Sequence, residues 1–209
     1  MDQTPPVLVI RVRTPDARTD VRIGQVQEFR IDHTSGTSEL KTMLMDALRL
    51  LLFPTLMAFA ASSDLLTMTI SNRVSLALIA GFFVLAFAIG MNVVDVAAHV
   101  GAGLLILTLA FGCFARGWIG GGDAKLAAST ALWLGFDQIF NYLLCASLLG
   151  GLLTVLIIRL RVVPLPNVLA GQEWVVRLHR VDAGVPYGIA LAAAALIVYP
   201  DTIWMKAFG

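Results

Sequence analysis

The sequence predicts an all-α membrane protein with about six transmembrane helices. Of its 209 residues, 58% are hydrophobic and only 14% are charged, and the mean hydropathy is +0.82. Soluble domains carry about 25% charged residues, whereas several apolar runs here approach the roughly 20 residues that cross a bilayer as a helix. The net charge of +1 gives no electrostatic reason to expect a nucleic acid partner.

The first 42 residues differ from the rest of the chain. Pro5, Pro6 and Pro15 and charges of both signs interrupt them, and they lack the apolar core of a secretory signal peptide. We therefore expect an N-terminal extension, 1–42, which is either weakly structured or the product of a misassigned start, followed by a membrane-embedded domain, 43–209.

Six apolar segments follow, and each is predicted to form a helix. They cover residues 43–61, 74–91, 96–114, 124–136, 139–158 and 185–199. At about 1.5 Å per residue, the fourth is too short to cross the hydrocarbon core alone. This predicts that neighbouring parts of the protein shelter its ends. The four tryptophans lie mostly near the expected ends of the spans, as in an aromatic belt.

Basic residues indicate the orientation in the membrane. The connections after the first, third and fifth segments contain Arg73, Arg116 and several further arginines, whereas those after the second and fourth contain no lysine or arginine. The positive-inside rule places the basic connections in the cytoplasm. The basic residues of the extension argue for the opposite orientation, but we follow the five downstream connections.

The long connection after the fifth segment is predicted to contain a cytoplasmic helix within 168–181. Pro164 and Pro166 prevent a simple continuation of the preceding helix. Beyond them, apolar Trp174 and Leu178 alternate with charged residues at helical spacing. Two arrangements fit this pattern: a helix in the membrane interface with its basic face toward anionic headgroups, or a loop helix packed on the bundle.

Asp64 and Asp123 are the two acidic residues that directly adjoin spans on the expected cytoplasmic side. A charge in lipid is costly and is usually functional. Two neighbouring carboxylates tend to share one proton, so that one can activate a water while the other polarises a carbonyl group. From the residues alone, the alternative is that both are interfacial acids that face water or pair with Arg73 and Lys125.

No other catalytic or metal-binding pattern competes with this pair. The sequence contains neither HExxH nor GxSxG. Cys113 and Cys145 lie in apolar runs without a CxxC spacing and are predicted to be small core residues. His33, His99 and His179 share no ligand spacing. We therefore expect neither a metal ion nor an organic cofactor.

Three short motifs resemble those of the type IV prepilin peptidases, in the same order and with similar spacing, over about residues 43 to 200. The first is Asp64 with the turn Ile70-Ser71-Asn72, in which serine stands where many members carry proline. The second, which resembles the family's GxGD motif and its following lysine, is Gly120-Gly121-Gly122-Asp123-Ala124-Lys125. The third, which resembles the opening of the family's last helix, is Pro186-Tyr187-Gly188.

The resemblance implies an aspartic endopeptidase of the inner (cytoplasmic) membrane. Its partner would be a prepilin or pseudopilin with a hydrophobic N-terminal helix, whose leader peptide it would remove at the cytoplasmic face, just after a glycine. Larger members add a methyltransferase region and a four-cysteine zinc-binding segment. This sequence shows neither, so it is similar to the small, peptidase-only class that serves the tight-adherence (Flp) pilus.

The resemblance also implies roles for individual residues. Asp64 and Asp123 would be the catalytic pair, and the residues expected to support the site are Asn72, Gly120, Gly122, Lys125, Pro186 and Tyr187. Plain structural roles stay open for these. The asparagine suits a helix N-cap, the glycines a turn, the lysine a headgroup contact, and the proline a helix start.

Two other functions remain open from the residues. One is a non-enzymatic transporter or an assembly subunit of a pilus or secretion system, in which the two acids line a polar path. Transporters tend to contain internal repeats, and none is evident. The other is a GxGD protease of the presenilin type, which would carry Tyr-Asp inside a span, and this dipeptide is absent. For the prepilin peptidase, the substrate helix is expected to enter between the spans near small residues, namely Gly101, Gly103, Gly150 and Gly151.

Overall fold

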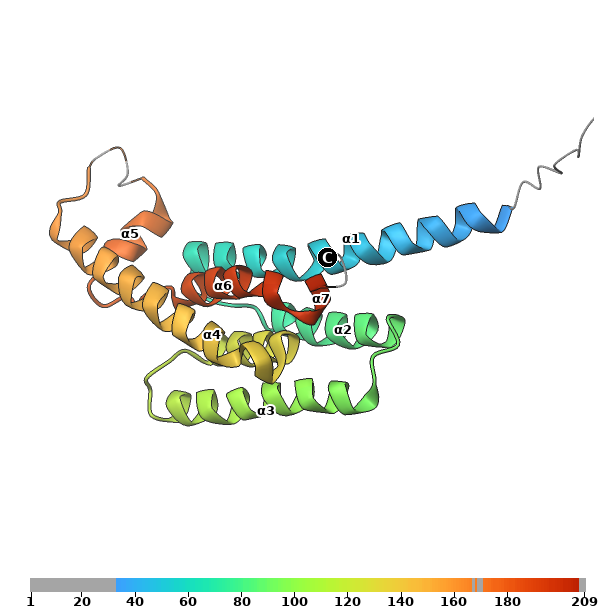
Figure 1. Ribbon diagram of the computed structural model, residues 1–209. Helices are drawn as coiled ribbons and strands as arrows, with labels where there is room; N and C mark the ends of the chain where they lie inside the picture. The colour runs from blue at the N-terminus through green and yellow to red at the C-terminus, as the bar shows by residue number, and fades with distance from the viewer. Residues whose placement is uncertain (1–32, 167, 169–170, 207–209) are drawn as a thin grey trace, which may run out of the picture. The chain divides into compact units, whose positions relative to one another are not determined.

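A computed structural model describes residues 33–166, 168 and 171–206 (Figure 1). Every regular element in this part of the chain is a helix, which confirms the all-α class. The elements are α1 (His33–Thr67), α2 (Asn72–Ala88), α3 (Val93–Ala115), α4 (Gly121–Val162), α5 (Glu173–His179), α6 (Tyr187–Val198), the 3₁₀ helix η1 (Tyr199–Asp201) and α7 (Ile203–Lys206).

The chain divides into two compact units, Met1–Leu40 and Lys41–Gly209. The division lies close to the predicted boundary between 42 and 43. Helix α1 begins at His33, ten residues before the first predicted span. Residues 1–32 lie outside the described part of the chain, so the nature of the extension stays a prediction. All residues from Lys41 onward belong to the second unit.

Four stretches of the described chain are long and apolar enough to cross a bilayer. They are Thr42–Thr67, Val93–Ala115, Gly121–Val162 and Tyr187–Lys206, and α2 is a shorter apolar helix of 17 residues. Large apolar side chains on their surfaces, such as Phe87 and Leu104, are exposed, as expected of helices that face lipid tails. The protein is therefore a multi-pass membrane protein.

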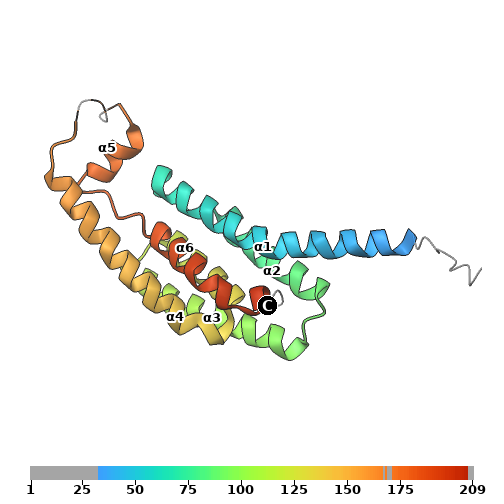
Figure 2. The ribbon, with the colours of Figure 1, turned by 45° about the horizontal axis from the view of Figure 1, so that its top comes forward.

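Helix α4 combines the fourth and fifth predicted segments, which meet at Gly135. This residue has φ 67° and ψ −180°, a conformation that favours glycine. A Cβ atom there would lie 2.9 Å from the His99 ring. The chain changes direction at this point, and the longer second arm, 136–162, then runs toward α5 (Figures 1 and 2).

The first arm of α4, 121–134, is the buried centre of the bundle. All residues from Leu126 to Gly135 are buried. Its length of 14 residues corresponds to about 21 Å, short of a bilayer core of about 30 Å. The prediction that neighbouring elements shelter this short helix is therefore confirmed.

An aromatic cluster fixes the end of the bundle opposite Asp64. Trp133 and Trp204 are 0% and 1% exposed, so the expectation of an interfacial belt is wrong for these two. Their burial is possible because both indole N–H groups find acceptors. Trp133 donates to the carbonyl of Leu78 and Trp204 to the carbonyl of Trp133, each at 2.8 Å. Phe53 stacks on Tyr199 beside them, with ring centroids 4.5 Å apart.

Helix α5 is shorter than predicted and packs against the protein. Val175 and Leu178 form its buried face. Arg177 Nη1 donates a hydrogen bond of 2.7 Å to the carbonyl of Leu66 near the end of α1. In α4, Arg161 donates to the carbonyl groups of Leu178, Ala183 and Gly184. These contacts favour the packed loop helix over the interfacial one.

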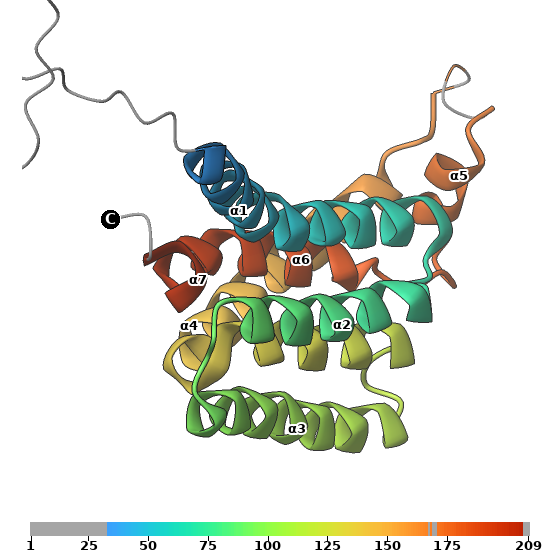
Figure 3. The same ribbon diagram turned by 90° about the vertical axis from the view of Figure 1, so that its right-hand side faces the viewer.

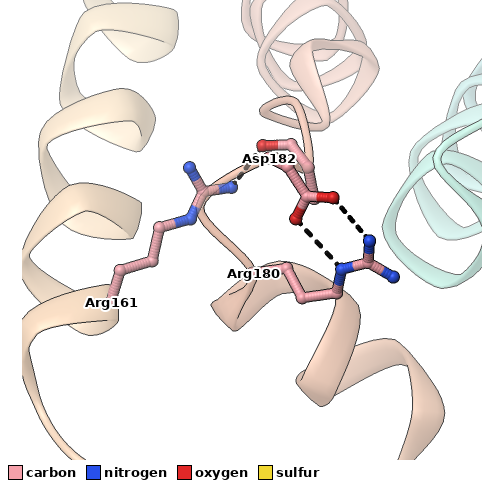
Figure 4. A network of polar contacts seen from close by, with 4 residues as sticks. Arg161, Arg180 and Asp182 are labelled. Atoms are coloured by element: carbon pink, nitrogen blue, oxygen red, sulfur yellow. Dashed lines mark hydrogen bonds and ion pairs between the residues drawn. The ribbon is translucent and has the colours of Figure 1, made fainter.

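An ion pair closes the turn that follows α5. Arg180 donates from Nε to Asp182 Oδ1 at 3.0 Å and from Nη2 to Oδ2 at 2.5 Å, beside Arg161 (Figure 4). Hydrogen bonding from Arg180 lowers the pKa of Asp182 below its usual value, and hydrogen bonding to Asp182 raises the pKa of Arg180. The pair therefore stays ionised at neutral pH. Because both side chains are exposed, its contribution to stability is small.

Candidate active site

Asp64 lies in the last turn of α1 and is 5% exposed. The backbone N–H of Gly188 donates a 2.7 Å hydrogen bond to its Oδ2 atom. Gly188 is the second residue of α6, where backbone N–H groups have no partner within the helix and attract negative charge. The contact requires glycine, since a Cβ at position 188 would lie 2.8 Å from Oδ2.

Asp123 lies in the first turn of α4, three residues after the N-cap Gly120. Its carboxylate turns back over Gly120 and accepts a hydrogen bond from that residue's N–H. A Cβ at position 120 would lie 3.0 Å from Asp123 Oδ2. This is the reach-back arrangement of a capping box, with aspartate in place of the usual glutamate. It fixes the carboxylate at the mouth of the helix.

The structure brings Asp64 and Asp123 together. Their carboxylates are close enough to interact electrostatically. Ile70 separates the starts of α4 and α6: its Cβ lies 3.2 Å from the Cβ position of Gly122, and its Cδ1 lies 2.7 Å from that of Gly188. The first, second and third motifs therefore meet at one point. A catalytic role for the two aspartates stays a prediction.

The glycines of the second motif are needed for space. Neither Gly120 nor Gly122 has a left-handed backbone conformation. Instead, Gly120 leaves room for the Asp123 carboxylate and Gly122 for Ile70. At the intervening Gly121, a Cβ atom would lie 3.3 Å from the Phe114 ring.

Asn72 and Lys125 contact each other rather than the aspartates. Lys125 Nζ donates a 2.9 Å hydrogen bond to Asn72 Oδ1. The expectation that Asn72 caps α2 is wrong, because Ser71 is the N-cap and its hydroxyl accepts from the N–H of Arg73 at 3.3 Å. The serine that replaces the family's proline thus has a structural role of its own.

The alternative that ion pairs explain the two aspartates is not supported by the described residues. Within this part of the chain, ion pairs join Arg49 to Asp46 at 3.7 Å and Arg180 to Asp182, and none involves Asp64 or Asp123. On α4, Lys125 is two positions from Asp123, so the two side chains do not face each other.

Pro186 and Tyr187 position the start of α6. Pro186 is the buried N-cap residue. The Tyr187 hydroxyl crosses to the second arm of α4, 3.5 Å from the carbonyl of Ala146, and lies where a Cβ at Gly150 would be. Gly150 is thus covered by Tyr187, whereas nothing lies within 4 Å of a Cβ at Gly151.

Tyr142 is a further residue near the candidate site, and the sequence did not single it out. It is 0% exposed, and its hydroxyl lies near Thr130 and interacts electrostatically with Asp123 and Tyr187. A tyrosine inside an apolar run needs somewhere to place its hydroxyl. Its position in the fifth predicted segment was a usable signal, but periodicity alone does not show which helix it faces.

The model of the type IV leader peptidase family matches residues 51–155, which are 105 of the 209 residues. This chain belongs to the type IV leader peptidase family. The resemblance to the prepilin peptidases is thereby confirmed at the level of the family. The matched range includes Asp64 and Asp123 and ends before the Pro186 motif.

Membership of this family indicates that the protein is a peptidase. Its long apolar helices indicate that this peptidase is a multi-pass membrane protein. The family membership argues against a transporter or a non-enzymatic assembly subunit. Comparison of this leader peptidase family member with curated proteins and with solved structures gave no match.

Proposed function

We propose that this leader peptidase is an aspartic endopeptidase that removes the leader peptide of a type IV prepilin or pseudopilin at the cytoplasmic face of the inner membrane. The proposal is supported mainly by the proximity of the Asp64 and Asp123 carboxylates in a protein of this family. Asp64 is buried and held by the Gly188 N–H, and Asp123 lies within electrostatic range of it.

The chemistry needs only these two side chains and a water. With one proton shared between Asp64 and Asp123, the ionised member takes a proton from the water, which attacks the scissile carbonyl carbon. The protonated member donates to the carbonyl oxygen and stabilises the tetrahedral intermediate. Proton transfer to the leaving amine then breaks the C–N bond. Because the pair titrates as a unit, the two roles are assigned to the pair and not to either aspartate individually.

The surroundings suit a substrate with a hydrophobic helix. Both aspartates lie at helix ends next to basic connections, which the positive-inside rule assigns to the cytoplasm. The site therefore meets the point where a leader emerges from the membrane. The substrate we propose is a Flp-type prepilin that is cleaved after a glycine.

The direct test is to express the protein with a tagged Flp-type prepilin and to follow loss of the leader on a gel. Asp64→Asn and Asp123→Asn should each lower the rate of cleavage by about 10²-fold or more, as expected when an acid–base group is lost. Matched controls are Asp95→Asn and Asp137→Asn, which carry the same change at the opposite ends of the spans. Undiminished cleavage by Asp64→Asn or by Asp123→Asn would show that the two aspartates are not a catalytic pair.

The dependence of activity on pH gives an independent test. Only the singly protonated pair is active in this mechanism, so kcat/KM of the purified enzyme should fall on both sides of an optimum. Activity that stays constant through the acid and the alkaline range would contradict a shared proton.

A further inference from the structure

A groove with a volume of about 530 Å³ lies between α2, α3 and the first arm of α4. Figure 3 looks onto α2 and α3, with α4 behind them. Each wall is a stripe of residues at helical spacing, for example Ile79 and Phe83 of α2 and Leu104 and Leu107 of α3. Phe83 and Leu104 are 45% and 57% exposed, so the walls face the lipid tails.

The groove is separate from the candidate active site. Its floor is formed by Lys125, Ala128 and Leu132, which follow one face of the first arm of α4. Asp123 is two positions from Lys125, so its side chain points to another face of the same helix. Neither Asp123 nor Asp64 lines the groove.

One end of the groove is polar and cationic. Lys125 is exposed and uses one of its three N–H donors on Asn72. It makes no ion pair with any carboxylate in the described residues. One turn along α2 from Asn72 lies Ser75, which is 6% exposed and whose Oγ is buried without a hydrogen-bond partner. A buried hydroxyl in an apolar wall is costly unless a ligand or water bonds it.

The size and the charge of the groove decide what it can hold. An extended acyl chain, which is much thinner than a helix of about 10 Å diameter, matches the apolar walls of the groove. Basic pockets between transmembrane helices on the cytoplasmic side are suited to anionic lipid headgroups.

We propose that this groove binds one anionic phospholipid of the cytoplasmic leaflet. The phosphate contacts the ammonium of Lys125, the Ser75 hydroxyl donates to a headgroup or ester oxygen, and an acyl chain lies along Phe83 and Leu104. The lipid thus packs against the face of α4 that lies behind Asp123. The binding itself does not depend on the peptidase chemistry.

The test is native mass spectrometry of the full chain in detergent, with phosphatidylglycerol or phosphatidylcholine of identical acyl chains as the probe. We expect the first lipid molecule to be phosphatidylglycerol, with a preference of about fivefold, the factor that one lysine near an anionic surface contributes. Lys125→Gln should remove this preference. Leu104→Trp, which fills the groove, should reduce the binding of both lipids.

Two controls separate the groove from general surface effects. Arg116→Gln removes another exposed cation, at the C-terminal end of α3 and outside the groove lining. Leu105→Trp introduces a tryptophan one position from Leu104, also outside the groove lining. Both should retain the preference of the wild type, and unfolding temperatures identify any variant that is misfolded.

Three outcomes would overturn the lipid site. These are equal affinity of the wild type for the two lipids, an unchanged preference in Lys125→Gln, and an equal loss in the controls. If Leu104→Trp blocks prepilin cleavage while lipid binding is unchanged, the groove belongs to the peptide substrate instead. Because the readout is lipid mass, failure of the aspartic mechanism would leave this result unaffected.

Discussion

At the scale of single residues, Gly188 is the tightest point of the candidate site. Its N–H holds Asp64, and its missing side chain leaves room both for that carboxylate and for Ile70. Ile70 is a rigid β-branched residue that also lies against Gly122. A methyl group at position 188 would therefore displace the groups on which the pairing of the two aspartates depends.

We predict that Gly188→Ala lowers kcat by about 10²-fold, since a shift of about 1 Å in a catalytic group has an effect of that size. The matched control is Gly184→Ala, because nothing lies within 4 Å of a Cβ at that position. Leader removal by the two variants, measured at equal amounts of folded protein, checks this. Equal activity of the two variants would show that the contact at 188 is dispensable.

A second prediction concerns Tyr142, whose hydroxyl interacts electrostatically with Asp123. Tyr142→Phe keeps the buried ring and removes only the hydroxyl, which has no hydrogen-bond partner among the described residues. Loss of its electrostatic effect on Asp123 should lower kcat by up to about fivefold, which corresponds to about 1 kcal/mol. The control is Tyr199→Phe, which loses a 2.7 Å hydrogen bond to the carbonyl of Arg49 at the opposite end of the bundle. The control should lower the unfolding temperature while kcat is retained. Normal kcat in Tyr142→Phe would place this hydroxyl outside the mechanism.

The sequence predicted the importance of residues whose charge is costly next to an apolar span. It predicted less about residues whose role depends on a distant neighbour. Asp64 and Asp123 stood out because a carboxylate beside an apolar span needs a reason to be there. The contact of Asn72 with Lys125 spans 53 positions of sequence. No local pattern distinguishes that contact from an N-cap, and Ser71 is an equally good cap.

At the scale of the elements, Gly135 determines how α4 is built. Both the left-handed backbone and the contact with the His99 ring exclude a side chain. His99 itself is held by a 2.8 Å hydrogen bond between its Nδ1 and the carbonyl of Leu132. The turn, the histidine and the end of the first arm therefore form a single packed unit.

We predict that Gly135→Ala lowers the free energy of unfolding by roughly 1–3 kcal/mol, the cost of holding a residue in a sparsely populated backbone conformation. Gly112→Ala in α3 is the control, since nothing lies within 4 Å of a Cβ there. Replacing glycine by alanine inside a helix should leave stability equal or slightly raised. Unfolding of both variants in mixed micelles measures the difference, and equal stabilities would contradict the argument.

Hydropathy predicted where the apolar helices lie but not how they connect. The segments 124–136 and 139–158 were predicted as two helices, whereas they are two arms of α4 that meet at Gly135, just before the predicted break. The short length of the first segment predicted that it is sheltered. The helix in the connection after the fifth segment was predicted less accurately. The alternation of apolar and charged residues suggested a helix over 168–181, whereas α5 covers only Glu173–His179. In that range Arg177 and Leu178 form hydrogen bonds with α1 and α4.

At the scale of the whole molecule, the orientation in the membrane is open to a labelling test. In a chain with Cys113 and Cys145 replaced by alanine, Gly171→Cys should react with a membrane-impermeant maleimide only after the inner membrane is opened. Asp201→Cys should react in intact spheroplasts. Both positions are exposed, so neither result is limited by burial. The reverse pattern would put the aspartates on the outer face, against the positive-inside rule.

The positions of two tryptophans depend on tertiary packing and could not be predicted from composition. The tryptophans were expected at the interface on general grounds, yet Trp133 and Trp204 lie in the core because carbonyl groups of Leu78 and Trp133 accept their N–H groups. Such acceptors arise only when the helices are assembled. The family, by contrast, was visible in short motifs that fold into a single site.

The short first arm of α4 also constrains how this protein is made. The arm carries Asp123 and Lys125 and is only 14 residues long, so it gains too little from lipid to remain in the bilayer alone. We therefore expect this arm to enter the membrane during synthesis together with the longer arm beyond Gly135, and not alone. The part of the candidate site that contains Asp123 would then form only after the chain has been translated well past its motif.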